Sequence, residues 1–325
     1  MDEMAAGPLS GRSDVSPALR AIVTCSSRKR VLVPPALRLS TLPQRTARAR
    51  ARAWAGRLDS HDAPILSARE LYAGDHWHVA QSLAGQARSC LELWVASAGY
   101  GLIHESRPIK PYSATFSEGP DSVVRNAQAG GREGYLREWW TLLAESERLA
   151  DDAPRSVRNL VAGDPEAILV VALSRSYLLA LRDDLIAARG ELRGPGKLLV
   201  VSAGTKSCPG LEENLVPIGV EVQGALGGSR LSLNVRILRH LVRTSHEHAW
   251  QADLMPSSFR GVKGNRPVPH RRTTLGDQAV VEFIGRAQRD ELNVSKSALL
   301  RRLRDQGFAC EQGRFWQLFA TTVVQ

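Results

Sequence analysis

The sequence has few of the features that mark secreted, membrane-spanning or metal-binding proteins. Its four cysteines are scattered at positions 25, 90, 208 and 310, and no two form a CxxC pair. This spacing argues against both a disulfide framework and a zinc ribbon. No apolar run approaches the ~20 residues that a transmembrane helix needs. Residues 1–17 carry acidic side chains and no continuous apolar core, so we expect a disordered lead-in rather than a secretory signal, and a cytoplasmic protein that does not contact a membrane.

The motifs of several common enzyme classes are also missing. The chain has no GxxxxGK[ST], no GxGxxG after a strand, no HExxH and no GxSxG. Their absence weakens the case for an NTPase, a dehydrogenase, a zinc protease and an α/β-hydrolase. The histidine pairs at 76 and 78 and at 246 and 248 do not have a recognised zinc spacing, and no cysteine pair completes them. We therefore expect no metal ion and no other cofactor.

Acidic residues are scarce where arginines are dense. The net charge is +10 and the sequence pI is about 9.9, which favours a polyanionic partner. Six arginines between Arg38 and Arg57, and a second basic region from Arg260 to Arg272, contain no acidic residue. A solvated basic face would give the same pattern, but two separate clusters favour contact with phosphates. The expected nucleic-acid backbone contacts are Lys29, Arg48, Arg52, Lys110, Lys206, Lys263, Arg271, Arg272, Lys296, Arg301 and Arg302.

Short apolar runs alternate with helical patterns along residues 18–253. Runs without polar alternation are typical of strands buried on both faces of a parallel sheet. The order therefore predicts an α/β domain with a parallel sheet. The expected strands are Ala21–Thr24, Leu91–Ala96, Ala167–Leu173 and Lys197–Ser202, and the expected helices are Gln44–Leu58, Ser67–Leu83, Asp121–Ala150 and Ser176–Arg189.

Each expected strand ends at a small hydroxyl residue, so these residues should share the carboxyl edge of the sheet, where ligands bind in open α/β folds. Two glycines bracket Tyr100 directly after one strand, which allows a sharp bend and a close approach to a ligand. Tyr100 and Tyr112 could stack on a base, or the turn could be packed with no ligand. Cys25 could be a nucleophile or a small packed residue. The expected substrate-binding residues are Cys25, Ser26, Ser27, Ser97, Gly99, Tyr100, Gly101, Tyr112, Ser174 and Ser202.

One carboxylate stands out near the expected edge. A helix over Ser67–Leu83 would bring Tyr72, Asp75 and His76 to one face within one turn. A carboxylate at that position could stabilise a cationic sugar during glycosidic cleavage, or it could be an ordinary surface group. Asp75 is the first candidate for this role, with Asp121 or Glu105 as substitutes.

The composition changes between Leu254 and Leu275, where proline, glycine and basic residues predict a linker. After it, the patterns predict helices at Gly276–Gln288 and Ser295–Arg304, then a strand–turn–strand over Phe308–Phe319. Helix, helix and wing is the order of a winged-helix module, which we expect over residues 276–325. In helix-turn-helix proteins the second helix enters the major groove, although the same module also mediates protein contacts.

Four segments together resemble a known group of domains: VTCSSRKR, ARELYAG, LWVASAGYGLI and IKPYSATF. They are similar to a family of bacterial and phage-borne domains and to the central domain of archaeosine synthase, in the wider set around tRNA-guanine transglycosylases. The resemblance covers Ile22–Phe116, is weaker up to Gly204, and does not include the tail. It implies a three-layer, uracil-DNA-glycosylase-like fold with the base pocket at the carboxyl edge of a parallel sheet. The family has an Asp after the Pro-Tyr pair, where this chain has Ser113.

Some proteins of this group are similar to phage-defence glycosylases that excise hypermodified bases. We therefore expect an enzyme that binds double-stranded DNA, flips out a modified base and hydrolyses its N-glycosidic bond to leave an abasic site. Two alternatives stay open. One is a non-catalytic nucleic-acid-binding regulator with a ligand-sensing α/β domain, and the other is a transglycosylase that exchanges a base in RNA. The sequence leaves the oligomeric state open.

Overall fold

The computed structural model describes residues 17–43, 46–83, 91–124, 131–194, 196–244, 273–290 and 294–322. The chain divides into two compact units, Met1–Arg266 and Pro267–Gln325. The division falls within the stretch predicted as a linker. Residues 254–272 of that stretch, and residues 1–16 of the predicted lead-in, lie outside the described residues.

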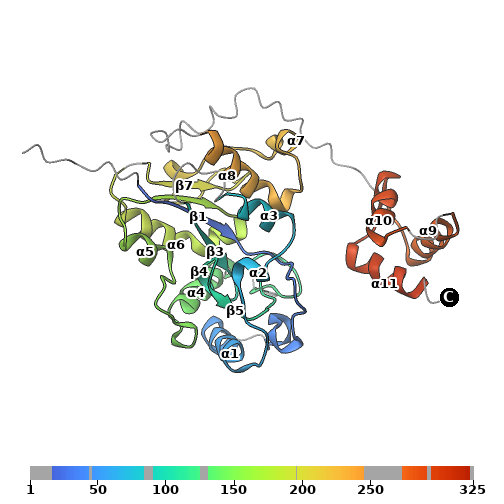
Figure 1. Ribbon diagram of the computed structural model, residues 1–325, viewed down its shortest axis with the longest axis horizontal. Coiled ribbons are helices and arrows are strands. Elements are labelled where there is room, and N and C mark those ends of the chain that lie inside the picture. Colours follow the sequence, from blue (N-terminus) through green and yellow to red (C-terminus); the bar gives the residue numbers. More distant parts are fainter. Residues whose placement is uncertain are drawn as a thin grey trace, which may run out of the picture. The chain divides into compact units, whose positions relative to one another are not determined.

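A five-stranded, mostly parallel sheet forms the centre of the first unit (Figure 1). β1 pairs in parallel with both β3 and β6, and β6 pairs in parallel with β7. β4 turns back and pairs antiparallel to β3. All four predicted strands form, which confirms the α/β class and the mainly parallel sheet. The strand bounds are β1 Leu19–Thr24, β3 Leu91–Ser97, β4 Gly101–His104, β6 Ile168–Ala172 and β7 Leu198–Val201.

The strands lack polar alternation because both of their faces are covered. Ala21, Ile22 and Val23 of the central strand β1 are fully buried, and every residue of β6 is buried. Helices α4, α5 and α6 pack together, while α8 contacts β6, β7 and α3. This arrangement is consistent with a three-layer α/β fold. None of the described helices is long and apolar enough to span a membrane.

The helices of this unit are joined by short loops and single turns of 3₁₀-helix. A two-stranded antiparallel ladder, β2 (Leu66–Ser67) with β5 (Pro108–Ile109), lies outside the main sheet. The helix bounds are α1 Ala47–Ser60, α2 Ala68–Leu71, α3 Asp75–Gln81, α4 Arg132–Ala144, α5 Val157–Ala162, α6 Arg175–Glu191, α7 Gln223–Leu226 and α8 Leu233–Thr244. The 3₁₀ turns are Pro35–Leu37, Leu39–Thr41, Glu147–Leu149, Glu212–Asn214, Val220–Val222 and Arg230–Ser232.

The predicted single helix over Ser67–Leu83 is wrong. It is two helices, α2 and α3, separated at Tyr72–Gly74. Gly74 has φ +92°, a left-handed conformation that interrupts a helix and that glycine adopts without strain. Tyr72 forms an isolated antiparallel bridge with Lys29. The predicted one-turn face of Tyr72, Asp75 and His76 therefore does not exist.

The predicted helix over Asp121–Ala150 also begins too early. Its regular part is α4, which starts at Arg132. Asp121–Val124 instead belongs to a loop in which Ser122 forms a parallel bridge with Thr115, and residues 125–130 lie outside the described residues. Because Asp121 lies in this loop and not in the helix, its carboxylate can contact other segments of the chain.

The described residues of the second unit form three helices and a two-residue ladder. They are α9 Asp277–Asp290, α10 Lys296–Asp305 and α11 Gln312–Thr322, with β8 Thr273–Thr274 pairing in parallel with β9 Phe308–Ala309. Because β8 takes part, the unit begins before the predicted boundary at residue 276. Phe315 of α11 is fully buried in a core formed with Val280, Ile284 and Leu299, among others.

The predicted strand–turn–strand over Phe308–Phe319 is wrong beyond β9. Phe315, Leu318 and Phe319 have helical spacing, i, i+3 and i+4, and they place one face of α11 against the core of the unit. The described residues of this unit therefore form three helices and a short parallel ladder, and they do not confirm the predicted winged helix.

Candidate functional site

The four parallel strands bring the predicted strand-end residues to one edge. Across the sheet the parallel strands lie in the order β3-β1-β6-β7. The chain runs from β1 to β3 on one side and then crosses to β6 on the other side, so the direction of winding reverses between β1 and β6. Ligands of open α/β sheets bind beyond the carboxyl ends of the strands at such a reversal. The register pairs Thr24 with Ala96 and Ala172 with Val201. The shared edge of Thr24, Ser97, Ser174 and Ser202 is thus confirmed.

The segment after β1 carries a thiol and an amine into a group of tyrosines. The Cys25 N–H donates to the Ala96 carbonyl (3.0 Å), and its Sγ lies 3.2 Å from the Tyr177 hydroxyl. The Lys29 Nζ donates to the Ser26 carbonyl (2.7 Å) and lies 4.4 Å from the Tyr112 ring centroid. Ring faces attract cations. We call Cys25, Lys29, Tyr72, Tyr112 and Tyr177 the strand-end cluster.

Burial changes the proton affinities of this cluster. It lowers the pKa of Lys29, an effect that the nearby Cys25 and Asp121 oppose. It raises the pKa values of Tyr72, Tyr112 and Tyr177 well above the usual value. The tyrosines therefore remain neutral hydroxyl groups at neutral pH, while Lys29 gives up its proton more readily than an exposed lysine.

The tyrosines expected to stack on a base are not open to one. Tyr112 is 0% exposed, and its hydroxyl lies 2.6 Å from the Ser97 Oγ and 2.8 Å from the Tyr72 hydroxyl. Tyr100 is 6% exposed, and its hydroxyl accepts from the Lys110 N–H (3.0 Å). Neither placement fits the predicted stacking role.

The glycine turn is held by the protein itself. The Trp139 indole of α4 donates to the Ala98 carbonyl and the Trp54 indole of α1 donates to the Gly99 carbonyl, both at 2.9 Å. A Cβ on Gly99 would lie 2.5 Å from the Tyr112 ring, and Gly101 has φ +78°. The glycines thus serve packing and backbone geometry, which fits the alternative of a packed turn.

Asp121 is the one of the three predicted carboxylates whose charge raises the pKa of Lys29 in the strand-end cluster. It accepts from the Ser40 N–H (2.9 Å) and the Ser113 hydroxyl (2.7 Å). Burial opposes ionisation, yet these hydrogen bonds lower the pKa of Asp121 overall. Its charge acts on Lys29 and keeps the pKa of that amine higher than burial alone would.

The other two carboxylates have different surroundings. Asp75 begins α3 and accepts from Arg236 (2.7 Å), and hydrogen bonding from Ser232 together with Arg236 lowers its pKa. Glu105 pairs with Arg69 (2.9 Å), and its N–H donates to the Leu93 carbonyl. Glu105 therefore lies beside the first half of β3, away from the carboxyl edge.

Some of the predicted serines are buried and hydrogen-bonded within the protein, and others are accessible to a ligand. Ser26 is buried and donates to the Ala73 carbonyl (2.6 Å), and the buried Ser202 lies 3.0 Å from the Thr205 hydroxyl. Ser27 is exposed, and the half-buried Ser174 begins α6. Only Ser27 and Ser174 are therefore well placed for a new ligand.

Three further contributors were not among the predicted site residues. Tyr177, in the first turn of α6, could have been found because a helix that follows a strand begins at the carboxyl edge. Ser113 holds Asp121 through a contact that no local pattern predicts. The His76 Nε2 lies 2.8 Å from the Thr24 carbonyl, and its buried Nδ1 has no partner among the described residues. Burial lowers the pKa of His76.

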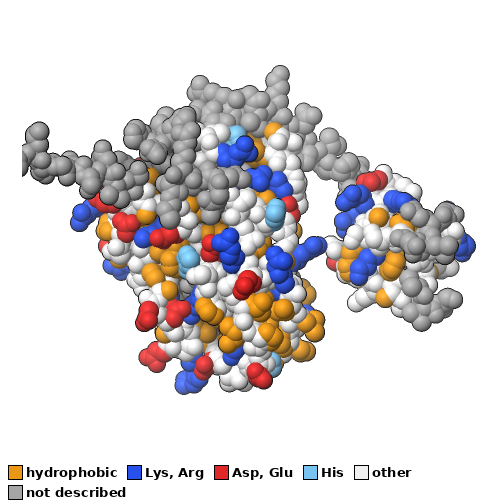
Figure 2. Space-filling view, viewed as in Figure 1, with side chains coloured by type: hydrophobic (Ala, Val, Ile, Leu, Met, Phe, Trp, Pro, Cys, Tyr) orange, Lys and Arg blue, Asp and Glu red, His pale blue; other side chains and the backbone are white. Residues whose placement is uncertain are grey.

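The predicted phosphate contacts are mostly exposed. Arg48, Arg52 and Lys206 lie at the surface, whereas Lys29 is occupied within the strand-end cluster. Figure 2 shows Lys and Arg side chains over the upper and middle part of the visible face of the first unit, with hydrophobic side chains gathered beneath them. Lys296, Arg301 and Arg302 are exposed on α10. Lys263, Arg271 and Arg272 lie outside the described residues.

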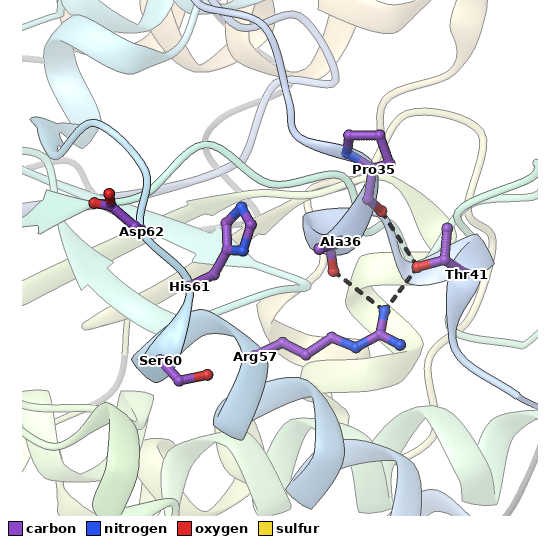
Figure 3. Close-up of a pocket in the computed structure, with 7 residues that line it drawn as sticks. All are labelled: Pro35, Ala36, Thr41, Arg57, Ser60, His61 and Asp62. Carbon is purple, nitrogen blue, oxygen red and sulfur yellow. Dashed lines mark hydrogen bonds between the residues drawn. The ribbon is translucent and has the colours of Figure 1, made fainter.

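A hollow of about 490 Å³ lies at the end of α1 (Figure 3). Arg57 lines it, but its guanidinium donates to the Ala36 carbonyl (3.2 Å) and the Thr41 hydroxyl (2.7 Å). His61 and Asp62 complete the wall, and no residue predicted for the site takes part. We therefore leave this hollow out of the candidate site.

Within the described ranges, no three or more His, Cys, Asp or Glu side chains are grouped to hold a metal ion. The histidines at 246 and 248 lie outside those ranges. Comparison with known proteins gives no further guide, because no family model and no curated protein matches this sequence.

Proposed function

We propose that the first unit cleaves the N-glycosidic bond of a nucleic-acid base at the carboxyl ends of β1 and β6. The observation that carries this proposal is that the half-buried Asp121 carboxylate, held by Ser40 and Ser113, lies near enough to raise the pKa of the Lys29 amine beside the reversal in strand order. Glycosidic cleavage needs a group that stabilises positive charge on the sugar and a group that protonates the leaving base. We assign the first role to Asp121 and the second role to Lys29.

Asp121 is the group that stabilises the positive charge on the sugar. Its lowered pKa keeps it ionised at neutral pH, so it can stabilise an oxocarbenium-like transition state. The Ser40 and Ser113 donors fix the orientation of the carboxylate before the substrate arrives, and this preorganisation is the main source of electrostatic stabilisation in enzymes.

Lys29 is the proton donor. As the bond between C1′ and the base nitrogen breaks, the electron pair goes to the base, which takes a proton from the Lys29 ammonium. Water adds to C1′, and the proton that water loses restores the ammonium through solvent. A lysine of lowered pKa is a stronger acid than an exposed one, and an acid is most effective when its pKa is near the working pH.

Double-stranded DNA with a modified base is the substrate that we propose. The base would leave the duplex at a cost of a few kcal/mol. Exposed cations support this choice: Arg48 and Arg52 on α1 and Lys296 and Arg301 on α10 can contact phosphates. The hypermodified base and the role in phage defence rest on the sequence resemblance.

The test is to incubate the full chain with unmodified DNA and with hypermodified phage DNA. Released base is measured by mass spectrometry, and abasic sites are measured by alkaline strand cleavage. We expect both products from the modified DNA only. Tight, salt-sensitive binding without either product would overturn the proposal.

That last outcome would favour a second candidate, a nucleic-acid-binding regulator. The observation in its favour is the closed state of the tyrosines, since Tyr100 and Tyr112 present no open ring to a flipped base. A regulator would bind DNA and a small ligand but release no base. Incorporation of a labelled free base into RNA would instead indicate the transglycosylase.

A further inference from the structure

Two buried arginines meet at Tyr100, outside the strand-end cluster. The Arg107 guanidinium carbon lies 6.0 Å from the Tyr100 ring centroid. Arg155 donates to the carbonyls of Tyr100 (3.0 Å) and Leu143 (2.7 Å). The Arg155 residue is 6% exposed, and the Arg107 side chain is 11% exposed. Both charges are therefore largely removed from water.

The negative charge near these arginines does not balance them. Asp151 pairs with the Arg107 Nε at 2.7 Å, whereas Arg155 forms no ion pair with a described carboxylate. Three buried guanidinium nitrogens have no acceptor among the described residues: Arg107 Nη1, Arg155 Nε and Arg155 Nη1. Buried charged donors are normally bonded, because leaving one without an acceptor is costly.

The two guanidinium groups also repel each other. Burial, and next the charge of Arg107, lower the pKa of Arg155 to about 10. Arg155 therefore remains charged at neutral pH, and an anion near both groups would relieve the repulsion.

A hollow of about 190 Å³ opens beside Arg107. Tyr100, Lys110, Arg148 and Asp59 also line it, whereas Arg155 is not one of its lining residues. A water molecule takes up about 30 Å³ of liquid, while sites for drug-sized ligands measure roughly 300–1,000 Å³. The hollow therefore has room for a small polyatomic ion but not for a whole nucleotide.

The rim adds further positive charge. Arg148 pairs with Asp59 at 3.1 Å, while the Lys110 ammonium donates to the Asp59 carbonyl (2.7 Å). Three cations, Arg107, Lys110 and Arg148, thus line the hollow with one carboxylate, Asp59, while Asp151 pairs with Arg107.

We propose that this hollow binds a phosphate group, with Arg107 as its principal ligand and Arg155 as the second buried charge. The planar guanidinium fork matches phosphate oxygens, and the Arg107 Nη1 has no acceptor among the described residues. The phosphate is either inorganic phosphate or the terminal phosphate of a nucleotide or nucleic acid. The site shares no residue with the strand-end cluster, so it stands or falls independently of the proposed glycosidic cleavage.

Calorimetric titration of the full chain with inorganic phosphate, at constant ionic strength in a phosphate-free buffer, tests the site. We expect saturable binding with a millimolar or tighter Kd, and a rise in Tm with phosphate. Arg107→Lys keeps the charge but loses the fork and should weaken binding at least about tenfold, since an ammonium cannot make the two parallel charge-assisted hydrogen bonds of a guanidinium. Arg193→Gln, an exposed arginine elsewhere on the unit, should bind phosphate like the wild type.

Competition distinguishes the sources of phosphate. If a 5′-phosphorylated oligonucleotide displaces phosphate and its unphosphorylated counterpart does not, the ligand is a terminal phosphate. If neither displaces it, the site takes free phosphate. Absence of any heat or Tm change up to tens of millimolar phosphate would overturn the proposal, and so would wild-type affinity in a folded Arg107→Lys variant.

Discussion

The Ser113 hydroxyl donates a 2.7 Å hydrogen bond to the Asp121 carboxylate. The residue after the Pro-Tyr pair is Ser113, where the resemblance expected from the sequence implies an Asp. The loop from Thr115 to Ser122 folds back through a bridge between these two residues and brings Asp121 to Ser113. The chain thus presents a carboxylate next to the position where the resemblance implies one, from a residue eight places further along.

Asp121→Asn should reduce base release at least about 100-fold, because it removes the charge that stabilises the sugar cation while keeping the shape of the side chain. DNA affinity should stay within about twofold of the wild type. The comparison is a single-turnover assay of base release beside a DNA-binding titration. Glu118→Gln is the matched control, since Glu118 lies in the same loop, is exposed and pairs only with Arg132 among the described residues.

Asp75→Asn provides a second comparison. Asp75 is already paired with Arg236, so we expect a smaller loss of rate than in Asp121→Asn. A larger loss in Asp75→Asn would return the catalytic role to Asp75, and full activity of Asp121→Asn would end the assignment to Asp121.

Lys29→Arg should remove the alkaline limb of the pH–rate profile. A general acid must carry its proton, so wild-type activity should fall as the pH rises through the pKa of Lys29, which burial lowers from its usual value near 10.5. Arginine keeps the charge but does not release its proton in this range, so the variant should be slow and nearly independent of pH there.

The control for this prediction is Lys206→Arg, at an exposed position of the same edge, which should keep the wild-type profile. Wild-type rates in Lys29→Arg, with the alkaline limb in place, would rule out Lys29 as the proton donor.

The strands, and the edge at which they end, could be predicted because both depend on local pattern. Fully buried strands require apolar runs, and a parallel sheet brings their carboxyl ends together. The break at Gly74 was missed because one glycine within a helical pattern does not by itself fix a helix end. The bridge between Tyr72 and Lys29 that accompanies the break joins residues far apart in sequence. Propensity alone gives one helix there, and tertiary contact overrides it.

The candidate site was predicted in position but not in detail. Hydroxyl residues at strand ends are visible in a sequence, whereas hydrogen bonds among Ser97, Tyr72 and Tyr112 form only when three separate segments pack. The burial that lowers the pKa of Lys29 comes from the same packing. Local sequence reads Lys29 as a surface cation because it lies in a basic run.

Gly99→Ala should destabilise the first unit by about 1–3 kcal/mol, the usual cost of overpacking a core. The added methyl would lie 2.5 Å from the Tyr112 ring, and that ring is held by Ser97 and Tyr72. Gly134→Ala is the control, because Gly134 lies within α4 with nothing within 4 Å of the added Cβ.

Replacing a helical glycine by alanine should stabilise the protein by about 0.5–1 kcal/mol. Urea unfolding of both variants measures the difference. Equal midpoints for Gly99→Ala and the wild type would show that the turn can shift to accept a side chain.

Arg301→Gln should weaken DNA binding uniformly across sequences and lower the slope of log K against log salt by about 1, as expected for the loss of one phosphate contact. Arg301 is exposed on α10. Arg286→Gln, at an exposed position of α9, is the control and should leave the slope unchanged. An unchanged slope in Arg301→Gln, with Arg286→Gln affected instead, would move the DNA-binding surface to α9.

Asp184 should make the stability of the first unit depend on pH in the acidic range. It lies on α6 and accepts from the Trp140 indole (2.8 Å) and the backbone N–H groups of Val157 (2.8 Å) and Arg158 (3.0 Å). Burial raises the pKa of Asp184 in the folded chain despite these donors. The folded chain therefore holds this proton more tightly than the unfolded chain does.

The stabilisation from that proton is present below the unfolded pKa of about 3.9 and is lost as the pH rises through the higher folded pKa. Urea unfolding of the wild type and of Asp184→Asn, from pH 3 to pH 6, measures it. The wild type should lose stability relative to Asp184→Asn as the pH rises across this window. Trp140→Phe removes one donor to the carboxylate, so it should raise the pKa of Asp184 further and move the same transition to higher pH. A difference between wild type and Asp184→Asn that stays constant with pH would contradict the raised pKa.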